Sequence, residues 1–342
     1  MQNRHLVVIG ASAGGIDALR EFVVQLPANF PAPVAVVLHT SPQSPGVLPE
    51  ILARSGPLPA LTPRSGERLK PGRIYVAPPD FHLLVEPGLL RVTNGPRENR
   101  FRPAIDPLFR SAAQVYGPAA IGVILTGNLD DGVAGLWTIK QLGGIAIAQD
   151  PRDAMFPSMP ENAIRHVKVD HIVPLANLGE LLTRLVSAPA GGEPSVASPP
   201  HLDAEIRIAM EADPVRAGVT RMGEPSTFAC PECHGVLLQM KEGGRVRFRC
   251  HTGHAYSAES LMAEMSEGIE AALWNAIRSL QEGALMLEQL SSHVGESHPP
   301  AESERLATRR EQLLKHADQL REMVTSRWTA PEELRDEPVK AD

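Results

Sequence analysis

The chain of 342 residues is long enough for two domains, and its apolar content of 43% suffices for a core of ordinary size. A formal net charge of −7 argues against a nucleic-acid scaffold, although the basic stretch 91–102 can still face an acidic partner. No apolar run approaches membrane-spanning length, and the N-terminus lacks the pattern of a signal peptide. We therefore expect a cytoplasmic protein that neither inserts into a membrane nor binds nucleic acid.

Residues 7–15, VVIGASAGG, predict a buried strand, a glycine-rich turn and then an amphipathic helix. A dinucleotide fingerprint is disfavoured, because Ser12 stands where the middle glycine is needed and the second strand ends in His39 rather than an acid. A phosphate loop is disfavoured, because Gly15 is followed by Ile16 rather than lysine. Two interpretations remain: a reactive serine at the positive end of a helix dipole, or a packed turn in which Ser12 only caps the helix.

Up to about residue 185, apolar strands alternate with helical patterns. This order predicts an α/β domain with a doubly wound, mostly parallel sheet and helices on both faces. The expected strands are Leu6–Ile9, Val34–Leu38, Ile74–Ala77, Ala120–Leu125, Ile145–Ala148 and His171–Pro174. The pair Leu83–Val85 and Leu89–Val92, split by a Glu-Pro-Gly turn, predicts a hairpin instead.

Polar side chains follow three of these strands: Ser12, His39, and the pair Asp130 and Asp131. Because ligands of open α/β sheets bind at the carboxyl ends of the strands, we expect these side chains at one edge. Nucleophilic ester or amide chemistry needs a hydroxyl, an imidazole that takes its proton and a carboxylate that orients the imidazole. Singly, His39 is also explained by a structural hydrogen bond, and the aspartates by turn formation or helix capping. Their joint placement favours catalysis.

Six blocks along the first 185 residues share one order: VVIGASAGG, VVLHTSP, IYVAPPDFHLLVE, FRPAIDPLFRSAA, GVILTGNLDDGVAGL and AQDPRDAMFPSMPENAI. In this order they resemble the catalytic domain of the chemotaxis receptor methylesterases of the CheB type. Enzymes of that family hydrolyse glutamyl methyl esters on receptors. The resemblance implies the same activity here, with no cofactor for catalysis and with glutamine deamidation as a related activity.

The resemblance implies a role for Ser12 as nucleophile, His39 as general base and Asp131 as the catalytic aspartate. It places a backbone N–H donor of the oxyanion hole at Asn128, where the family usually has methionine. It also places weaker substrate or oxyanion contacts at Ala13, Arg102 and Met159. Members from chemotaxis carry an N-terminal receiver domain, whereas this chain begins at the first catalytic strand, so we expect no receiver and no control by phosphorylation within the chain.

The three cysteines all lie late in the chain, at Cys230, Cys233 and Cys250. A Cys-x-x-Cys turn, a β-like pair (236–240 and 245–249) and then Cys-His-Thr-Gly-His have the spacing of a zinc ribbon. For the fourth ligand we favour His254 over His251, because adjacent Cys-His ligation is awkward; His234 is a third candidate. We therefore predict a structural Zn²⁺ that supplies much of the local folding free energy.

Residues 257–293 and 301–327 predict two long helices, with Ser257 as the N-cap of the first. They most simply form an antiparallel hairpin, used for self-packing and homo-oligomers or as a helical surface for a receptor. The predicted parts are an α/β domain over 1–186, a linker with a short helix over 187–222, a zinc ribbon over 223–256, a helical hairpin over 257–330 and a tail over 331–342.

We thus expect a serine hydrolase that demethylates glutamyl methyl esters on a chemoreceptor-like protein. The alternative is a non-catalytic signalling scaffold or sensor that retains the fold for binding, and a dinucleotide-dependent enzyme is a third option. Labelling of Ser12 by a fluorophosphonate probe separates the first two, and a thermal shift toward nucleotides tests the third.

Overall fold

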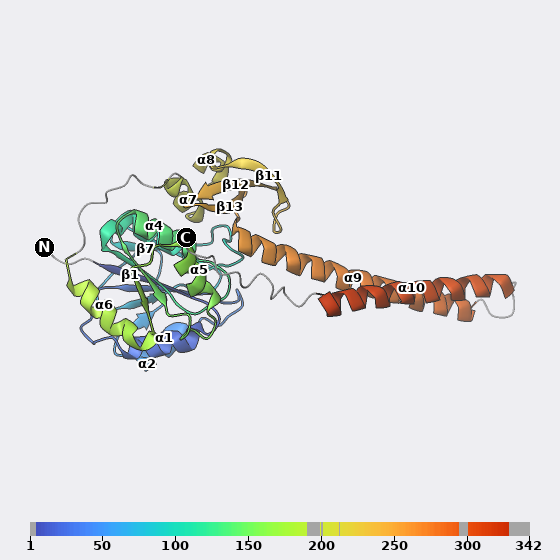
Figure 1. Ribbon diagram of the computed structural model, residues 1–342, viewed down its shortest axis with the longest axis horizontal. Helices are drawn as coiled ribbons and strands as arrows, with labels where there is room; N and C mark the ends of the chain where they lie inside the picture. The colour runs from blue at the N-terminus through green and yellow to red at the C-terminus, as the bar shows by residue number, and fades with distance from the viewer. Residues whose placement is uncertain (1–4, 190–198, 200, 212, 294–299, 328–342) are drawn as a thin grey trace, which may run out of the picture. The chain divides into compact units, whose positions relative to one another are not determined.

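The computed structural model describes residues 5–189, 199, 201–211, 213–293 and 300–327 (Figure 1). The chain falls into two compact units, Met1–Leu261 and Met262–Asp342, each of which is described by itself. Among the described residues, no helix combines the length and the apolar character needed to cross a bilayer.

The first unit is built around a seven-stranded sheet in the order β10-β9-β8-β1-β2-β5-β3, and every neighbouring pair is parallel. Its strands are β1 (Leu6–Ala11), β2 (Val34–Leu38), β3 (Ala60–Leu61), β5 (Ile74–Val76), β8 (Ala120–Ile124), β9 (Ile145–Gln149) and β10 (His171–Val173). The predicted doubly wound α/β architecture is confirmed. The very short β3 was not predicted, because two residues carry no periodic signal.

Helices cover both faces of this sheet (Figure 1). One face carries α1 (Gly15–Val24), α2 (Leu48–Ser55) and α6 (Leu178–Ser187), and the other carries α3 (Ile105–Tyr116), α4 (Val133–Gln141) and α5 (Ser158–His166). Strand β1 shows why: Leu6 and Val8 pack into one core while Val7 and Ile9 pack into the other, as alternation along a buried strand requires. The predicted hairpin is β6 (His82–Glu86) with β7 (Leu89–Thr93), and β4 (Glu67–Arg68) extends it.

A second, four-stranded antiparallel sheet belongs to the same unit: β11 (Glu224–Ala229), β12 (Val236–Glu242), β13 (Arg245–Cys250) and β14 (Ala255–Ser257). Before it come α7 (Leu202–Ala209) and α8 (Pro214–Ala217), so the described part of the region predicted as a linker is folded. Its apolar side chains explain this, since Leu202, Ile206 and Val219 are buried. Most of the proline-rich stretch 187–200, and the tail 331–342, lie outside the described residues.

The second unit consists of two long helices, α9 (Ala258–His293), which begins in the first unit, and α10 (Pro300–Arg327). Ile277 packs with Ala317 and Val324, and Arg310 pairs with Glu288 at 3.4 Å, so the helices run antiparallel. The predicted apolar stripe is only partly covered, because Met265 and Ile269 stay exposed. The two antiparallel helices form the predicted hairpin.

Candidate functional site

The carboxyl ends of three adjacent strands bring Ser12, His39 and Asp131 together. Ser12 follows β1, His39 follows β2 and Asp131 lies in the loop after β8, and these strands are neighbours in the order β8-β1-β2. The chain passes from β1 to β2 on one side of β1 and later returns to β8 on the other side. The switch point, where open α/β sheets form their sites, therefore lies between β1 and β8.

A hydrogen-bonded chain joins the three side chains. His39 Nδ1 lies 3.1 Å from Ser12 Oγ, and His39 Nε2 lies 2.7 Å from Asp131 Oδ2. An ionised carboxylate only accepts, so Nε2 carries a proton and Nδ1 of the neutral ring is left to accept from the serine hydroxyl. The imidazole stacks on Phe101, with ring centroids 3.7 Å apart and an interplanar angle of 10°. This arrangement suits a general base and a nucleophile.

Asp131 is buried and accepts hydrogen bonds from several directions. Besides His39, the donors are the Asn99 amide at 2.8 Å and the backbone N–H of Ile105 at 2.6 Å, at the start of α3. Burial alone would raise the pKa of Asp131, but His39 and these donors hold that pKa below its ordinary value. The carboxylate is therefore kept ionised beside the imidazole.

Helix capping, which the sequence allowed for Ser12 and for the aspartates, does not occur. The N-cap of α1 is Gly14, in a left-handed conformation with φ 73°, and Ser12 makes no side-chain cap there. The N-cap of α4 is Gly132, again without a side-chain cap from the aspartates. Asp130 faces elsewhere: its carboxylate pairs with Arg245 and accepts from Ser257 Oγ at 2.6 Å.

Only some of the predicted oxyanion and substrate residues line the cleft that contains Ser12. Ser12, Ala13, His39 and Arg102 line one cleft of about 440 Å³. Within the described residues, the backbone N–H groups of Ala13 and Asn128 donate to no protein acceptor, and Ala13 but not Asn128 lines the cleft.

Arg102 and Met159 both contact other parts of the protein. The Arg102 guanidinium is engaged, with Asp80 at 2.8 Å and the Gly95 carbonyl at 2.9 Å. Met159 is fully buried beneath Gly127, where any added Cβ would lie 2.9 Å from its sulfur and 2.8 Å from Ser12 Cβ. Met159 thus supports the loop that follows β8.

The sequence analysis missed three residues that shape this site. Asn99 holds Asp131, Phe101 stacks on His39, and Thr126 links two loops by donating to the Ala13 carbonyl at 3.0 Å and accepting from Phe156 N–H at 2.8 Å. Asn99 and Phe101 lie in a stretch rich in arginine, which we interpreted as a basic surface. An asparagine and a phenylalanine within that stretch were the available signal.

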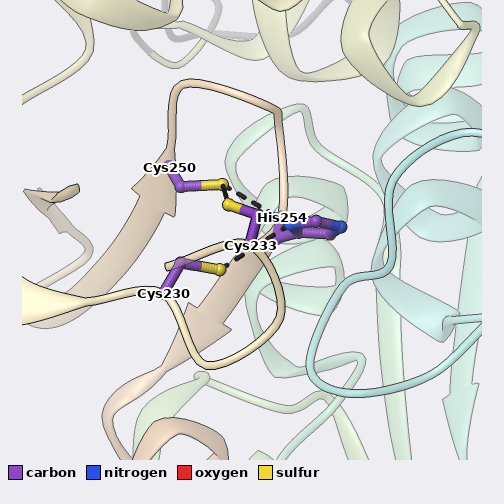
Figure 2. A group of neighbouring side chains, drawn as sticks. All are labelled: Cys230, Cys233, Cys250 and His254. Atoms are coloured by element: carbon purple, nitrogen blue, oxygen red, sulfur yellow. Dashed lines mark hydrogen bonds between the residues drawn. The ribbon is translucent and has the colours of Figure 1, made fainter. Parts of the chain in front are cut away.

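A second cluster joins Cys230, Cys233, Cys250 and His254 (Figure 2). Their ligand atoms all lie within 4.8 Å of one another. The Cys233 and Cys250 sulfurs are 3.6 Å apart, and His254 Nδ1 lies 3.7 Å from the Cys230 sulfur and 3.6 Å from the Cys250 sulfur. A tetrahedral zinc ion with Zn–S bonds of about 2.3 Å separates its ligands by about 3.8 Å. The donor set and spacing therefore fit zinc.

The surroundings of this cluster also resemble a metal site. Glu232 lies 3.3 Å from His254 Nε2, the position from which a carboxylate commonly orients a ligating imidazole. Thr252 Oγ lies 3.1 Å from the Cys233 sulfur. Neither His251 nor His234 belongs to the cluster.

Comparison with known proteins follows this geometry. The CheB methylesterase family model matches residues 7–182, about half of the chain. This chain belongs to the CheB methylesterase family. A Leptospira interrogans protein with the provisional name protein-glutamate methylesterase/protein-glutamine glutaminase is 41% identical over 184 residues, covering 54% of this chain and 95% of that protein.

Two further relatives extend the comparison. The Myxococcus xanthus protein-glutamate methylesterase FrzG is 38% identical over 182 residues, with 53% of this chain and 54% of that protein covered. The crystal structure of the Thermotoga maritima CheB methylesterase catalytic domain aligns with a TM-score of 0.51 and 35% identity, over 53% of this chain and 98% of that domain. The CheB similarity thus accounts for the α/β part.

Proposed function

We propose that this chain is a serine hydrolase that removes methyl groups from glutamyl methyl esters of a chemoreceptor-like protein. The observation that carries the proposal is the hydrogen-bonded chain from Ser12 through His39 to Asp131 at the switch point of the sheet. The names of the CheB relatives, which specify protein-glutamate methylesterase and glutaminase, support the choice of substrate.

The reaction follows from the positions of these side chains. His39 Nδ1 takes the proton of Ser12 as Oγ attacks the ester carbonyl, while Asp131 stabilises the imidazolium. The oxyanion that forms then accepts hydrogen bonds from the backbone N–H groups of Ala13 and Asn128. As the C–O bond breaks, His39 passes the proton to the leaving methoxide oxygen, and methanol departs. Water that gives its proton to the same nitrogen then attacks the acyl-enzyme and releases glutamate and Ser12. Glutamine deamidation uses these steps with ammonia as the leaving group.

Methanol release from a methylated receptor of the host tests this proposal. We expect Ser12→Ala to reduce the rate by about 10⁴- to 10⁶-fold, because no other hydroxyl is presented to His39 Nδ1 in the same geometry. The matched control is Ser187→Ala on the exposed end of α6, which should leave the rate unchanged. Equal inertness of the wild type and Ser12→Ala on every methylated receptor of the host would contradict the hydrolase proposal.

The scaffold alternative gives a different result with a chemical probe. A fluorophosphonate reacts with a serine only when a neighbouring base activates the hydroxyl. We expect labelling of the wild type at Ser12 and none of Ser12→Ala. An unlabelled but folded wild type would favour a non-catalytic scaffold.

We also propose that Cys230, Cys233, Cys250 and His254 bind one structural Zn²⁺. The sheet that carries them has a small core, with Leu237, Phe248 and Tyr256 as its main buried side chains, so a metal would supply part of its folding free energy. No step of the esterase reaction needs this ion.

Metal analysis of the purified protein tests the zinc proposal. We expect about one zinc ion per chain in the wild type and in His251→Ala, and loss of that zinc in His254→Ala. The two histidines lie three residues apart, so His251→Ala controls for loss of an imidazole. Equal zinc content in both variants would contradict the ligand assignment.

A cytoplasmic location, homo-oligomers through the long helices and a receptor's helical bundle as their partner stay predictions from the sequence.

A further inference from the structure

A short loop, residues 97–102, lies between the two polar clusters, and we call it the bridging loop. It contacts two of the three proposed catalytic side chains, since Asn99 donates to Asp131 and Phe101 stacks on His39. The adjacent buried His82 ties its ends, with Nε2 2.9 Å from the Pro96 carbonyl and Nδ1 accepting from Ala104 N–H at 3.2 Å. The loop is therefore well placed to fix the site.

Backbone hydrogen bonds anchor the bridging loop to the antiparallel sheet. Asn99 N–H donates to the Ala255 carbonyl at 2.8 Å, and Ala255 N–H donates to the Arg97 carbonyl at 3.2 Å. These bonds place the loop beside β14 as a short added strand segment. Strand β14 begins one residue after His254, the proposed metal ligand. The ion pair of Glu98 with Arg249 of β13 strengthens this attachment, and its ion pair with Arg110 joins the loop to α3 as well.

The Asn99 side chain uses both ends of its amide. Its Nδ2 donates to Asp131 at 2.8 Å and to Asp106 at 3.0 Å, while its Oδ1 accepts from Ser257 N–H at 2.9 Å and Ser260 Oγ at 3.2 Å. The orientation is fixed by chemistry: carboxylates accept only, and a backbone N–H donates only. Asn99, Ser257 and Ser260 are all buried, so water cannot substitute for these bonds.

We propose that Asn99 is a positioning residue of the esterase reaction, through which the segment 255–260 of the C-terminal sheet holds Asp131 in its working orientation. The proposal rests on the proposed function and adds a control of that site. A change that moves β14 or the start of α9 would then reach Asp131 through the Asn99 side chain.

Two substitutions separate positioning from other effects. Asn99→Gly removes both ends of the amide while it tolerates the left-handed backbone at this position, φ 49°. Asn99→Asp keeps the acceptor for Ser257 but loses the donor to Asp131. The matched control is Asn177→Asp on the exposed start of α6.

The measurement is fluorophosphonate labelling of Ser12 under saturating conditions, together with thermal unfolding of each variant. We expect both Asn99 variants to lower the first-order labelling constant by about 10- to 100-fold and to leave the probe's binding constant unchanged. A loss of folding alone would lower the labelled fraction rather than this constant. Wild-type labelling constants in folded Asn99→Gly would overturn the proposal, even if Asn99→Asp were slow, because the effect would then come from the added charge.

The link to the C-terminal sheet has its own test. Ser260→Ala removes one donor to Asn99 Oδ1, and we expect about a two- to fivefold slower labelling constant in the wild-type background but no further loss in Asn99→Gly. The same fold-loss in both backgrounds would overturn the link. If the wild type is never labelled, the hydrolase proposal fails and this inference fails with it; labelled wild type with unaffected variants contradicts the inference alone.

Discussion

The two polar clusters of the first unit are built in opposite ways. Ser12, His39 and Asp131 lie at the ends of strands of a parallel sheet, and two large apolar cores hold these strands in place. The Cys230–His254 cluster lies in a small antiparallel sheet with few buried apolar side chains. The packed sheet sets the geometry of the first cluster, whereas the proposed metal at the second cluster would supply part of the stability of the small sheet that carries it.

Because of this difference, we expect substitutions at the two sites to have different effects, one on activity and the other on stability. A substitution in the first cluster removes chemistry and leaves the fold, because the sheet does not depend on the polar contacts. A substitution in or beside the second cluster removes structure. The bridging loop is the exception, since it belongs to the first cluster by its contacts and to the second by its attachment.

The sharpest test of the scaffolded site is Asp131→Asn. The amide presents a donor to His39 Nε2, which favours the tautomer with a proton on Nδ1, so that Nδ1 no longer accepts from Ser12. We expect methanol release to fall by about 10⁴-fold with only a small fall in the unfolding midpoint, because the buried Ile105 N–H loses its acceptor. A large fall in the midpoint would break the comparison, because it would show that this site also supports the fold.

The next largest effect is expected for Arg249→Met, at the base of the antiparallel sheet. Arg249 is fully buried and pairs with Glu98 and Glu205, each at 3.0 Å. Burial alone would raise the pKa of Glu205, but Arg110, Arg247 and Arg249 lower that pKa to about 2.

Removing Arg249 leaves two buried carboxylates undercompensated, so the free energy of unfolding should fall by about 3–5 kcal/mol in urea titrations. The control is Arg278→Met, whose exposed pair with Glu282 on α9 should change stability by less than about 0.5 kcal/mol. Equal effects of the two variants would remove the basis for treating Arg249 as structural.

The smallest effect concerns Asp106, beside Asp131. Burial, and then the charge of Asp131, raises the pKa of Asp106 from 3.8 to about 6. Because the folded protein binds this proton more tightly, the associated stability is complete below pH 3.8 and is lost as the pH rises through about 6.

Asp106→Asn should therefore flatten the fall in unfolding free energy between about pH 4 and pH 7. Urea titrations at several pH values measure this slope, with exposed Asp17→Asn as the control. An unchanged slope would mean that Asp106 titrates alike in the folded and unfolded chains.

The sequence predicted what repeats or what has fixed spacing. Alternating strands and helices predicted the doubly wound sheet, and the rule for strand ends predicted that Ser12, His39 and the pair Asp130 and Asp131 would share one edge. The choice of Asp131 came from the family resemblance. The Cys-x-x-Cys spacing predicted four donors that the structure brings together. These predictions succeeded because each rests on local periodicity or on one topological rule.

Contacts between distant segments were beyond such rules. Asn99 meets Ser257 across 158 positions, and nothing in either residue's neighbourhood announces the other. The glutamate and arginine residues near Asn99 suggested an exposed charged stretch, yet Glu98 is buried because Arg110 and Arg249 neutralise it. Within the predicted linker 187–222 one short helix was expected, and the structure has α7 there; α8 was not predicted, because its four residues carry no periodic signal.

Gly127 has a consequence for changing the substrate range of this protein. Any side chain there would press on Ser12 and on the sulfur of Met159. The next residue, Asn128, is exposed and contributes only its backbone to the proposed oxyanion hole. A mutant library should therefore keep position 127 fixed and randomise position 128, whose exposed side chain can change without displacing the serine.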